Sequence, residues 1–179
     1  MTVPLRERKV DLIFLLFFVI NLVLVTYIID LEQLVIADPN HFTYPVWPPA
    51  PMIDLVHSYG HSLDPLLLAR PPFWRMSIWI DVLFFGPFYA FAIYAFIRGR
   101  SWIRVPALVW SGMMLSNVLI ILMDERYGVS ATPHFGQVLL LNLPWLAFPV
   151  GMIVRMRHDR PFERRAAPIV ETVEAVEAA

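Results

Sequence analysis

The sequence contains no cysteine, and lysine occurs once among its fourteen basic residues. The absence of cysteine excludes disulfide bonds, thiol catalysis and cysteine metal sites. Neither a phosphate-binding glycine loop nor a nucleophile elbow is present, and only clustered arginines bear on nucleic-acid binding, so no nucleic-acid partner is predicted. Apolar residues are abundant: 58% of the 179 residues are hydrophobic, against about 45–50% in a soluble domain. The composition therefore predicts an integral membrane protein.

Four apolar runs are long enough to cross a hydrocarbon layer of roughly 30 Å as helices, which takes about 17–25 residues. The runs are residues 12–30, 73–97, 105–123 and 138–154. Helices are expected because an isolated strand leaves its backbone groups without hydrogen bonds in lipid. The first run is too long for the apolar core of a signal peptide, and no small-residue cleavage site precedes Asp30. The predicted fold class is all-α, a polytopic membrane protein with a four-helix bundle.

Arginines cluster before the first run, between the second and third, and after the fourth. The positive-inside rule then places both termini in the cytoplasm. The predicted parts are an N-terminal segment over 1–11, a membrane domain over 12–157 with a proline-rich, irregular outer loop over 31–72, and a disordered cytoplasmic tail over 158–179. Arginine in preference to lysine, with no cysteine, indicates a GC-rich bacterial gene and hence a bacterial cell membrane.

Asp30 and Asp81 are unusual because both carboxylates lie in segments that are predicted to cross the bilayer. Asp81 lies roughly 12 Å along its helix from the outer end, where a charged aspartate costs about 2.5–3.5 kcal/mol. Asp30 ends the first run on the same side, so both acids are expected in the outer half of the membrane. At close range one acid would hold a proton while the other is charged. Such residues usually face the bundle interior and mark a functional site.

The surroundings of the two acids fit a pocket for an apolar molecule with a polar or cationic group. Aromatic faces beside a carboxylate favour an amine cation, and a few inward polar groups in an apolar cavity are usual for small-molecule sites. Kinks at Pro87, Pro144 and Pro149 would open space between helices. The predicted lining residues besides the two acids are Thr26, Tyr27, Phe84, Phe85, Phe88, Asn117, Asn142 and Trp145.

Structural readings of the same residues stay open. Asp81 would be structural if it paired with Arg75 or with Ser and Asn groups of neighbouring helices. Asn117 and Asn142 would then join helices by hydrogen bonds.

His57, His61 and Asp64 have a spacing that would suit a metal site on a helix. Gly60 and the nearby prolines weaken helix formation there, so neither a metal nor another cofactor is predicted.

Four segments occur in order along the chain: "TYIIDLEQL", "DPLLLARPPFWR", "IDVLFFGPFYAFAIYAFIRGRSWIRVPAL" and "NLPWLAFPVGMI". With these segments, residues 12 to 157 resemble the EXPERA-domain family, which includes the emopamil-binding sterol isomerase and the sigma-2 receptor. The resemblance implies the four-helix form of the sigma-2 receptor and a homodimer. It also implies that Asp30 pairs with a ligand amine, that Asp81 is its partner acid, and that Asp64 has a structural role.

The resemblance leaves catalysis open. Thr26 stands where the isomerase has a catalytic histidine, and Ile78 stands where it has a second catalytic glutamate. The isomerase pair on the last helix is present as Asn142 and Trp145. We therefore predict a binder of a sterol-like or cationic amphiphilic molecule. The alternatives are a sterol or lipid double-bond isomerase that uses the two acids as proton donor and acceptor, and a structural or regulatory membrane protein whose acids only hold helices together.

Overall fold

The computed structural model describes residues 2–163, and in this part of the chain the regular elements are helices, with one isolated β-bridge between Thr2 and Glu163. Four helical stretches are long and apolar enough to cross a membrane: Lys9–Val35, Pro72–Arg98, Ser101–Tyr127 and Phe135–Arg155. The predicted all-α fold class with four membrane-spanning helices is confirmed.

The first two spanning stretches are each interrupted by π-helical turns. The first consists of α1 (Lys9–Ile20), η2 (Asn21–Asp30) and α2 (Leu31–Val35), and the second of α5 (Pro72–Ile80), η3 (Asp81–Phe85) and α6 (Gly86–Arg98), where η2 and η3 are π-helical. Pro87 has no N–H to donate, so the regular helical ladder is interrupted where η3 meets α6. Nothing in the local sequence explains η2. π-Helical turns are frequent at functional sites.

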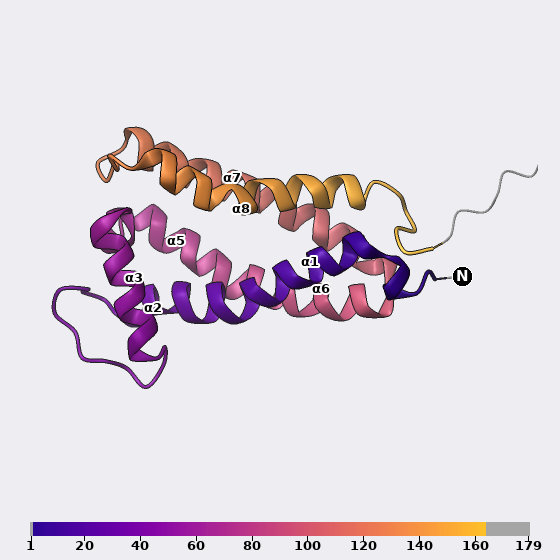
Figure 1. Ribbon diagram of the computed structural model, residues 1–179, viewed down its shortest axis with the longest axis horizontal. Coiled ribbons are helices and arrows are strands. Elements are labelled where there is room, and N and C mark those ends of the chain that lie inside the picture. Colours follow the sequence, from indigo (N-terminus) through magenta and orange to yellow (C-terminus); the bar gives the residue numbers. More distant parts are fainter. Residues whose placement is uncertain (1, 164–179) are drawn as a thin grey trace, which may run out of the picture.

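The other two spanning stretches form an antiparallel hairpin. After η4 (Ser101–Ile103) come α7 (Arg104–Tyr127) and α8 (Phe135–Arg155), which lie side by side, while α1 packs against α6 (Figure 1). Pro144 and Pro149 lie inside α8. Aromatic rings dominate the core between these helices. They include Phe14, Phe17, Phe18, Phe85, Phe88, Tyr89, Phe96 and Trp110.

The outer loop contains a helix that the sequence reading did not expect. α3 (Ala50–Ser62) follows residues 36–49, and the short α4 (Leu66–Ala69) follows α3. The prolines that were read as helix-breaking start α3 instead: Pro49 caps it and Pro51 lies in its first turn, where a missing N–H is tolerated. Trp47 Nε1 donates a hydrogen bond of 2.7 Å to the carbonyl of Tyr27, which holds the loop against the first spanning stretch.

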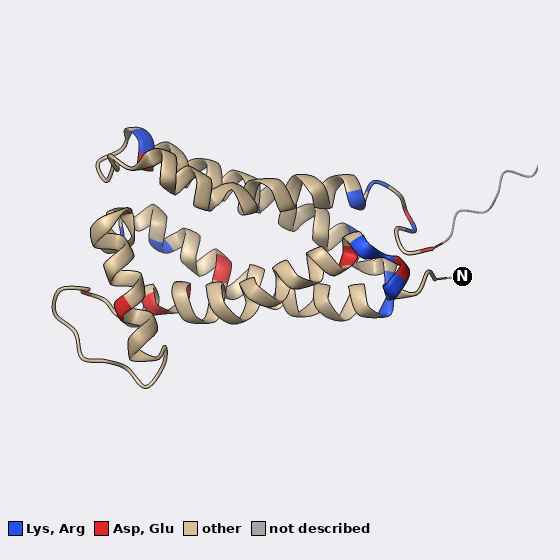
Figure 2. Cartoon of the chain, viewed as in Figure 1, with Lys and Arg blue, Asp and Glu red and all other residues tan. Residues whose placement is uncertain are grey.

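Charged residues gather towards the two ends of the bundle and leave the middle of the long helices almost free of charge (Figure 2). At the end where α1 begins and α8 ends, next to η1 (Leu5–Glu7), Asp11 is bound by Arg8 at 2.6 Å and by both Nε and Nη2 of Arg155 at 2.6 and 2.9 Å. The start of the predicted disordered tail folds back onto this network. Phe162 is fully buried there, with the guanidinium groups of Arg8 and Arg155 over its ring. Residues 164–179 of that predicted tail lie outside the described residues.

A second buried ion pair lies at the opposite end. Arg70 Nη2 contacts both oxygens of Glu32 at 2.8 and 3.0 Å, and Arg70 Nη1 donates to the carbonyl of Ile36. His57 Nε2 lies 2.8 Å from Glu32 Oε1. This network ties α3 and the segment before α5 to the Val35 end of the first spanning stretch.

Candidate ligand-binding site

The π-helical turns bring Asp30 and Asp81 to facing positions on the first two spanning stretches. Asp30 is the last residue of η2 and Asp81 is the first of η3, and each is only 8% exposed. Thr26 Oγ1, one turn before Asp30, donates a short hydrogen bond to Asp81 Oδ1. The Asp30 carboxyl is close enough to Asp81 for the two groups to interact electrostatically. Two acids far apart in the chain, together with Thr26, thus form one buried cluster.

Gly86 makes this close approach sterically possible. A Cβ at that position would lie 2.9 Å from Thr26 Cγ2 and 2.9 Å from the hydroxyl oxygen of Tyr27. A side chain there would push the first spanning stretch away from the second. Glycine therefore permits Thr26 to reach Asp81 and places Tyr27 at the edge of the cluster.

Asp30 and Asp81 differ in their partners from Asp11 and Glu32, which are also buried acids of the first spanning stretch. Asp11 and Glu32 are each bound by arginine, whereas no ion pair to either Asp30 or Asp81 is formed within residues 2–163. The predicted alternative partner of Asp81, Arg75, donates to the carbonyl of Ala37 instead. The acid cluster is therefore polar and buried without a neutralising cation from the described chain.

Buried aromatic side chains follow Asp81 along the second spanning stretch. Phe85 and Phe88 are buried, and Phe88 stacks on Trp110 with ring centroids 5.1 Å apart. Tyr89 is buried as well and lies close enough to interact electrostatically with both acids. Within the described residues, the Tyr89 hydroxyl and Trp110 Nε1 lie close together but make no hydrogen bond of regular geometry. Sequence reasoning missed Tyr89 because its position in an apolar run gives no sign of this placement.

Four predicted lining residues are not brought to the acid cluster. Phe84 is 61% exposed and points away from the core. Asn117 accepts a hydrogen bond of 2.6 Å from Ser77 and so joins α7 to α5. Asn142 donates to the carbonyl of Val138 in its own helix, while Trp145 Nε1 donates to Asn21 at 2.8 Å. The last three polar groups serve contacts between or within helices in this structure.

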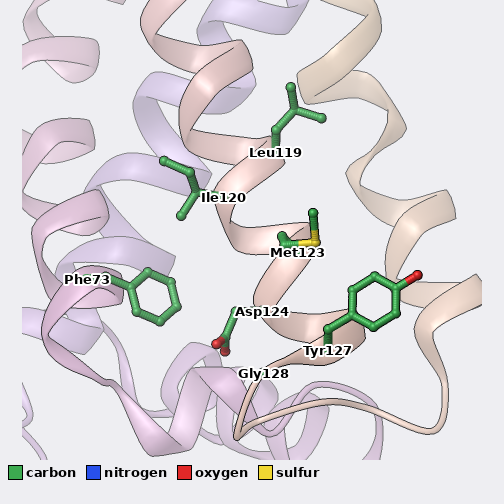
Figure 3. A pocket seen from close by; sticks show the side chains of 7 residues that line it. All are labelled: Phe73, Leu119, Ile120, Met123, Asp124, Tyr127 and Gly128. Carbon is green, nitrogen blue, oxygen red and sulfur yellow. The ribbon is translucent and has the colours of Figure 1, made fainter.

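Three open pockets of the described chain lie elsewhere. One is between α5 and α7 (Figure 3), one lies along the outer loop from Val35 to Pro45, and one lies between α1 and α8. Neither Asp30 nor Asp81 lines any of them. Because both acids are buried, the acid cluster is closed by packed side chains, and a ligand would reach it only if those side chains moved.

Asp64 forms a second pair of buried carboxyls, outside the acid cluster. It accepts a hydrogen bond of 3.1 Å from the backbone N–H of Leu66 at the start of α4, and its carboxyl lies close to that of Glu125, near the end of α7. Both side chains are buried. Burial raises the pKa of the Asp64 carboxyl above its ordinary value of 3.8. Sequence reasoning missed Glu125, because nothing in "MDERY" shows that it faces Asp64 rather than water.

This pair predicts a pH-dependent stability. A raised pKa means that folded Asp64 holds its proton more tightly than the unfolded chain does, so its stabilisation is complete below about pH 4 and is lost as the pH rises through the folded pKa. We expect the thermal midpoint of the purified protein, followed by tryptophan fluorescence, to fall as the pH is raised above about 4. Asp64→Asn should flatten that slope. An unchanged slope in this variant would show that other groups cause it.

Comparison with known proteins identifies the family. Residues 51–156, more than half of the chain, match the family described as EXPERA (EXPanded EBP superfamily). The chain belongs to the EXPERA family. Among its relatives is "Sigma intracellular receptor 2" from Xenopus tropicalis, 26% identical over 160 residues, which cover 83% of this chain and 88% of the relative. The human and Macaca fascicularis proteins of the same name are each 30% identical over 124 residues, covering 68% of this chain and 65% of theirs.

Membership of the EXPERA family agrees with four apolar spanning helices, and the protein is a multi-pass membrane protein. The matched EXPERA region contains Asp64 and Asp81 but begins after Asp30. The relatives are vertebrate, so they do not support the bacterial source that the composition indicated.

Proposed function

We propose that this EXPERA protein binds a sterol-like or cationic amphiphilic molecule inside the membrane. Asp30 and Asp81 anchor the polar or cationic group of the ligand, and Phe85, Phe88 and Tyr89 contact its apolar body. The observation that carries the proposal is the pair of buried acids on adjacent π-helical segments with no cation bound to either within the described residues. The relatives named as receptors support a binding role.

The unpaired polar atoms fit this role physically. Leaving a buried charge without a partner is costly, so the Asp30–Asp81 cluster attracts a cation or shares a proton. The Tyr89 hydroxyl and Trp110 Nε1 are buried and close together, but they make no hydrogen bond of regular geometry in residues 2–163. A ligand with a polar head would satisfy these groups while its apolar part replaces contacts among the core rings. Since the cluster is closed by side chains, we expect entry to require their rearrangement.

Double-bond isomerisation remains the alternative function. It needs one group to protonate an alkene and another to remove a proton elsewhere, and Asp30 and Asp81 are the two candidates. Thr26 binds Asp81 and Ile78 is buried and apolar, so the positions that carry catalytic groups in the isomerase supply no acid or base here. A migrated double bond in a sterol incubated with the purified protein, lost in Asp81→Asn, would favour this alternative over binding alone.

The test of the proposed function compares two steroids of one skeleton, one with a 3-amino group and one with a 3-hydroxyl group. We expect the wild-type protein in nanodiscs to bind the amine more tightly. Asp30→Asn should weaken amine binding by about thirtyfold or more, because removing one partner of a buried charge pair costs 2–5 kcal/mol or more. Binding of the hydroxysteroid should change much less. Equilibrium binding of radiolabelled steroid gives both affinities.

Asp38→Asn provides the matched control. Asp38 lies on the exposed outer loop beside His41, so the same substitution there should leave both affinities unchanged. If Asp30→Asn bound the aminosteroid as tightly as the wild-type protein, the anchoring role would be rejected.

Two further features of the EXPERA protein remain proposals. We propose that the end of the bundle carrying both Arg8 and Arg155 faces the cytoplasm, because arginines gather there and the positive-inside rule applies to them. We also propose a homodimer, which rests only on the family resemblance.

A further inference from the structure

An open groove between α5 and α7 shares no residue with the proposed Asp30–Asp81 site (Figure 3). Its volume is about 510 Å³, within the usual range for a small-molecule site. Its lining consists of Phe73, Leu119, Ile120, Met123, Asp124, Tyr127 and Gly128. Leu119, Ile120 and Met123 are exposed on the bundle surface. In a membrane-spanning bundle such a groove opens towards lipid.

Asp124 is the one charged side chain in this groove, and it has no cation bound to it within residues 2–163. Its Oδ2 atom is buried and has no hydrogen-bond partner there. Nearby Arg126 is directed elsewhere, with its guanidinium 5.7 Å from the ring centre of Tyr127 and 5.2 Å from that of Phe135. The carboxyl of the neighbouring acid, Glu125, interacts with that of Asp64. The groove thus presents a carboxylate that nothing in the described chain neutralises.

Gly128 lies directly against this carboxylate. A Cβ at Gly128 would lie only 1.9 Å from Asp124 Oδ1, so no side chain can stand there. In Figure 3 the Asp124 side chain lies between Phe73, from α5, and Tyr127, from the last turn of α7. A carboxylate flanked by two aromatic rings suits an organic ammonium group, which both kinds of neighbour attract.

The groove is polar at one end and apolar at the other, which matches an amphiphile inserted in one leaflet of the bilayer. Asp124 and Tyr127 lie in the last turns of α7, at the level where tyrosine is enriched in membrane proteins. Leu119 lies roughly 8 Å further along the helix axis, towards the middle of the span. The charged end of the groove is therefore interfacial and its apolar end reaches into the hydrocarbon layer.

We propose that this groove binds a single-chain membrane amphiphile with a primary ammonium head group. The ammonium sits on Asp124 between the rings of Phe73 and Tyr127, and the chain lies along Leu119 and Ile120. Asp124 Oδ2 accepts no hydrogen bond within the described residues, and the N–H groups of a primary ammonium would donate one to it. A neutral head leaves the carboxylate without a counter-charge, and an anionic head is repelled by it.

The test uses the full chain in nanodiscs of zwitterionic lipid and a twelve-carbon primary amine that carries a photoreactive diazirine in its chain. The matched alcohol, with the same chain and diazirine, is the neutral probe. After illumination, mass spectrometry quantifies the label on residues 119–128. We expect the amine to label this segment at least tenfold more than the alcohol does, and unlabelled dodecylamine to compete.

Three variants make the result specific. Asp124→Asn should reduce amine labelling of residues 119–128 at least tenfold, and Ile120→Trp, on an exposed position, should reduce it by filling the groove. Asp30→Asn should leave it unchanged, which separates this groove from the proposed steroid site. If Asp124→Asn does not fold, Ile120→Trp and the amine–alcohol comparison decide the question. Equal labelling by amine and alcohol, or labelling insensitive to Asp124→Asn, would show that the groove only accommodates acyl chains.

Discussion

Glu32→Gln is expected to lower the free energy of unfolding by about 3–5 kcal/mol. Glu32 is 1% exposed and forms a two-point ion pair with Arg70, which is itself buried. Glutamine keeps the shape but removes the charge, so the Arg70 guanidinium is left buried without a counter-ion. His57 also loses its charged partner. We expect α3 and the outer loop to separate from the bundle before the spanning helices unfold.

Titration with SDS in mixed micelles measures this loss, with helix content as the signal. Asp38→Asn is the control at the same end of the molecule, because its partner His41 is largely exposed and exposed pairs contribute only about 0–1 kcal/mol. A Glu32→Gln protein as stable as the Asp38→Asn protein would mean that water or lipid head groups neutralise Arg70.

Asp11→Asn is expected to have an effect of similar size at the opposite end. Asp11 is fully buried and is the shared partner of Arg8 and Arg155. Its contact with Arg155 bridges 144 residues of sequence. Removing its charge leaves two guanidinium groups close together with no acid between them, which adds like-charge repulsion to the loss of the pair. The loss should again be about 3–5 kcal/mol and should appear as the release of α8 from α1.

Proteolysis of the purified protein provides a second readout for Asp11→Asn. Cleavage after Arg155 and Arg157 should become faster, because the turn that carries Phe162 is held down by the same arginines. Glu163→Gln is the matched control: its exposed pair with Arg160, whose side chains are 33% and 75% exposed, should contribute little. Equal cleavage of the two variants would contradict the role assigned to Asp11.

These two buried ion pairs hold the first spanning stretch at both ends. Between them lies η2, whose wider π-helical turns carry Thr26 and Asp30. Firm ends allow the middle of a helix to keep an unusual geometry, because the contacts of the surrounding structure maintain it. The ion pairs therefore support the proposed ligand site without taking part in it.

Sequence reasoning succeeded where each segment could be read by itself. The four spanning helices followed from length and hydropathy, since lipid requires every crossing segment to satisfy its own backbone hydrogen bonds. The presence of Asp30 and Asp81 on the same side of the bilayer followed from helix direction. Their role in ligand binding stays a prediction, as does that of Thr26, Tyr27, Phe85 and Phe88.

The sequence reading was least informative where partners had to be assigned. It treated Arg8 and Arg155 as markers of topology, and it did not single out Glu32 or Glu125, although all four are partners in buried contacts. His57 was weighed as a metal ligand, but it contacts Glu32.

The sequence by itself determined the membrane class and the number of spans, because each of these depends on the composition of continuous segments. Only the tertiary structure decided which acids have a cation partner and which do not. The Glu32–Arg70 and Asp11–Arg155 pairs join residues 38 and 144 positions apart, and their geometry depends on how the helices pack. The distinction between structural acids and candidate binding acids arises from that packing.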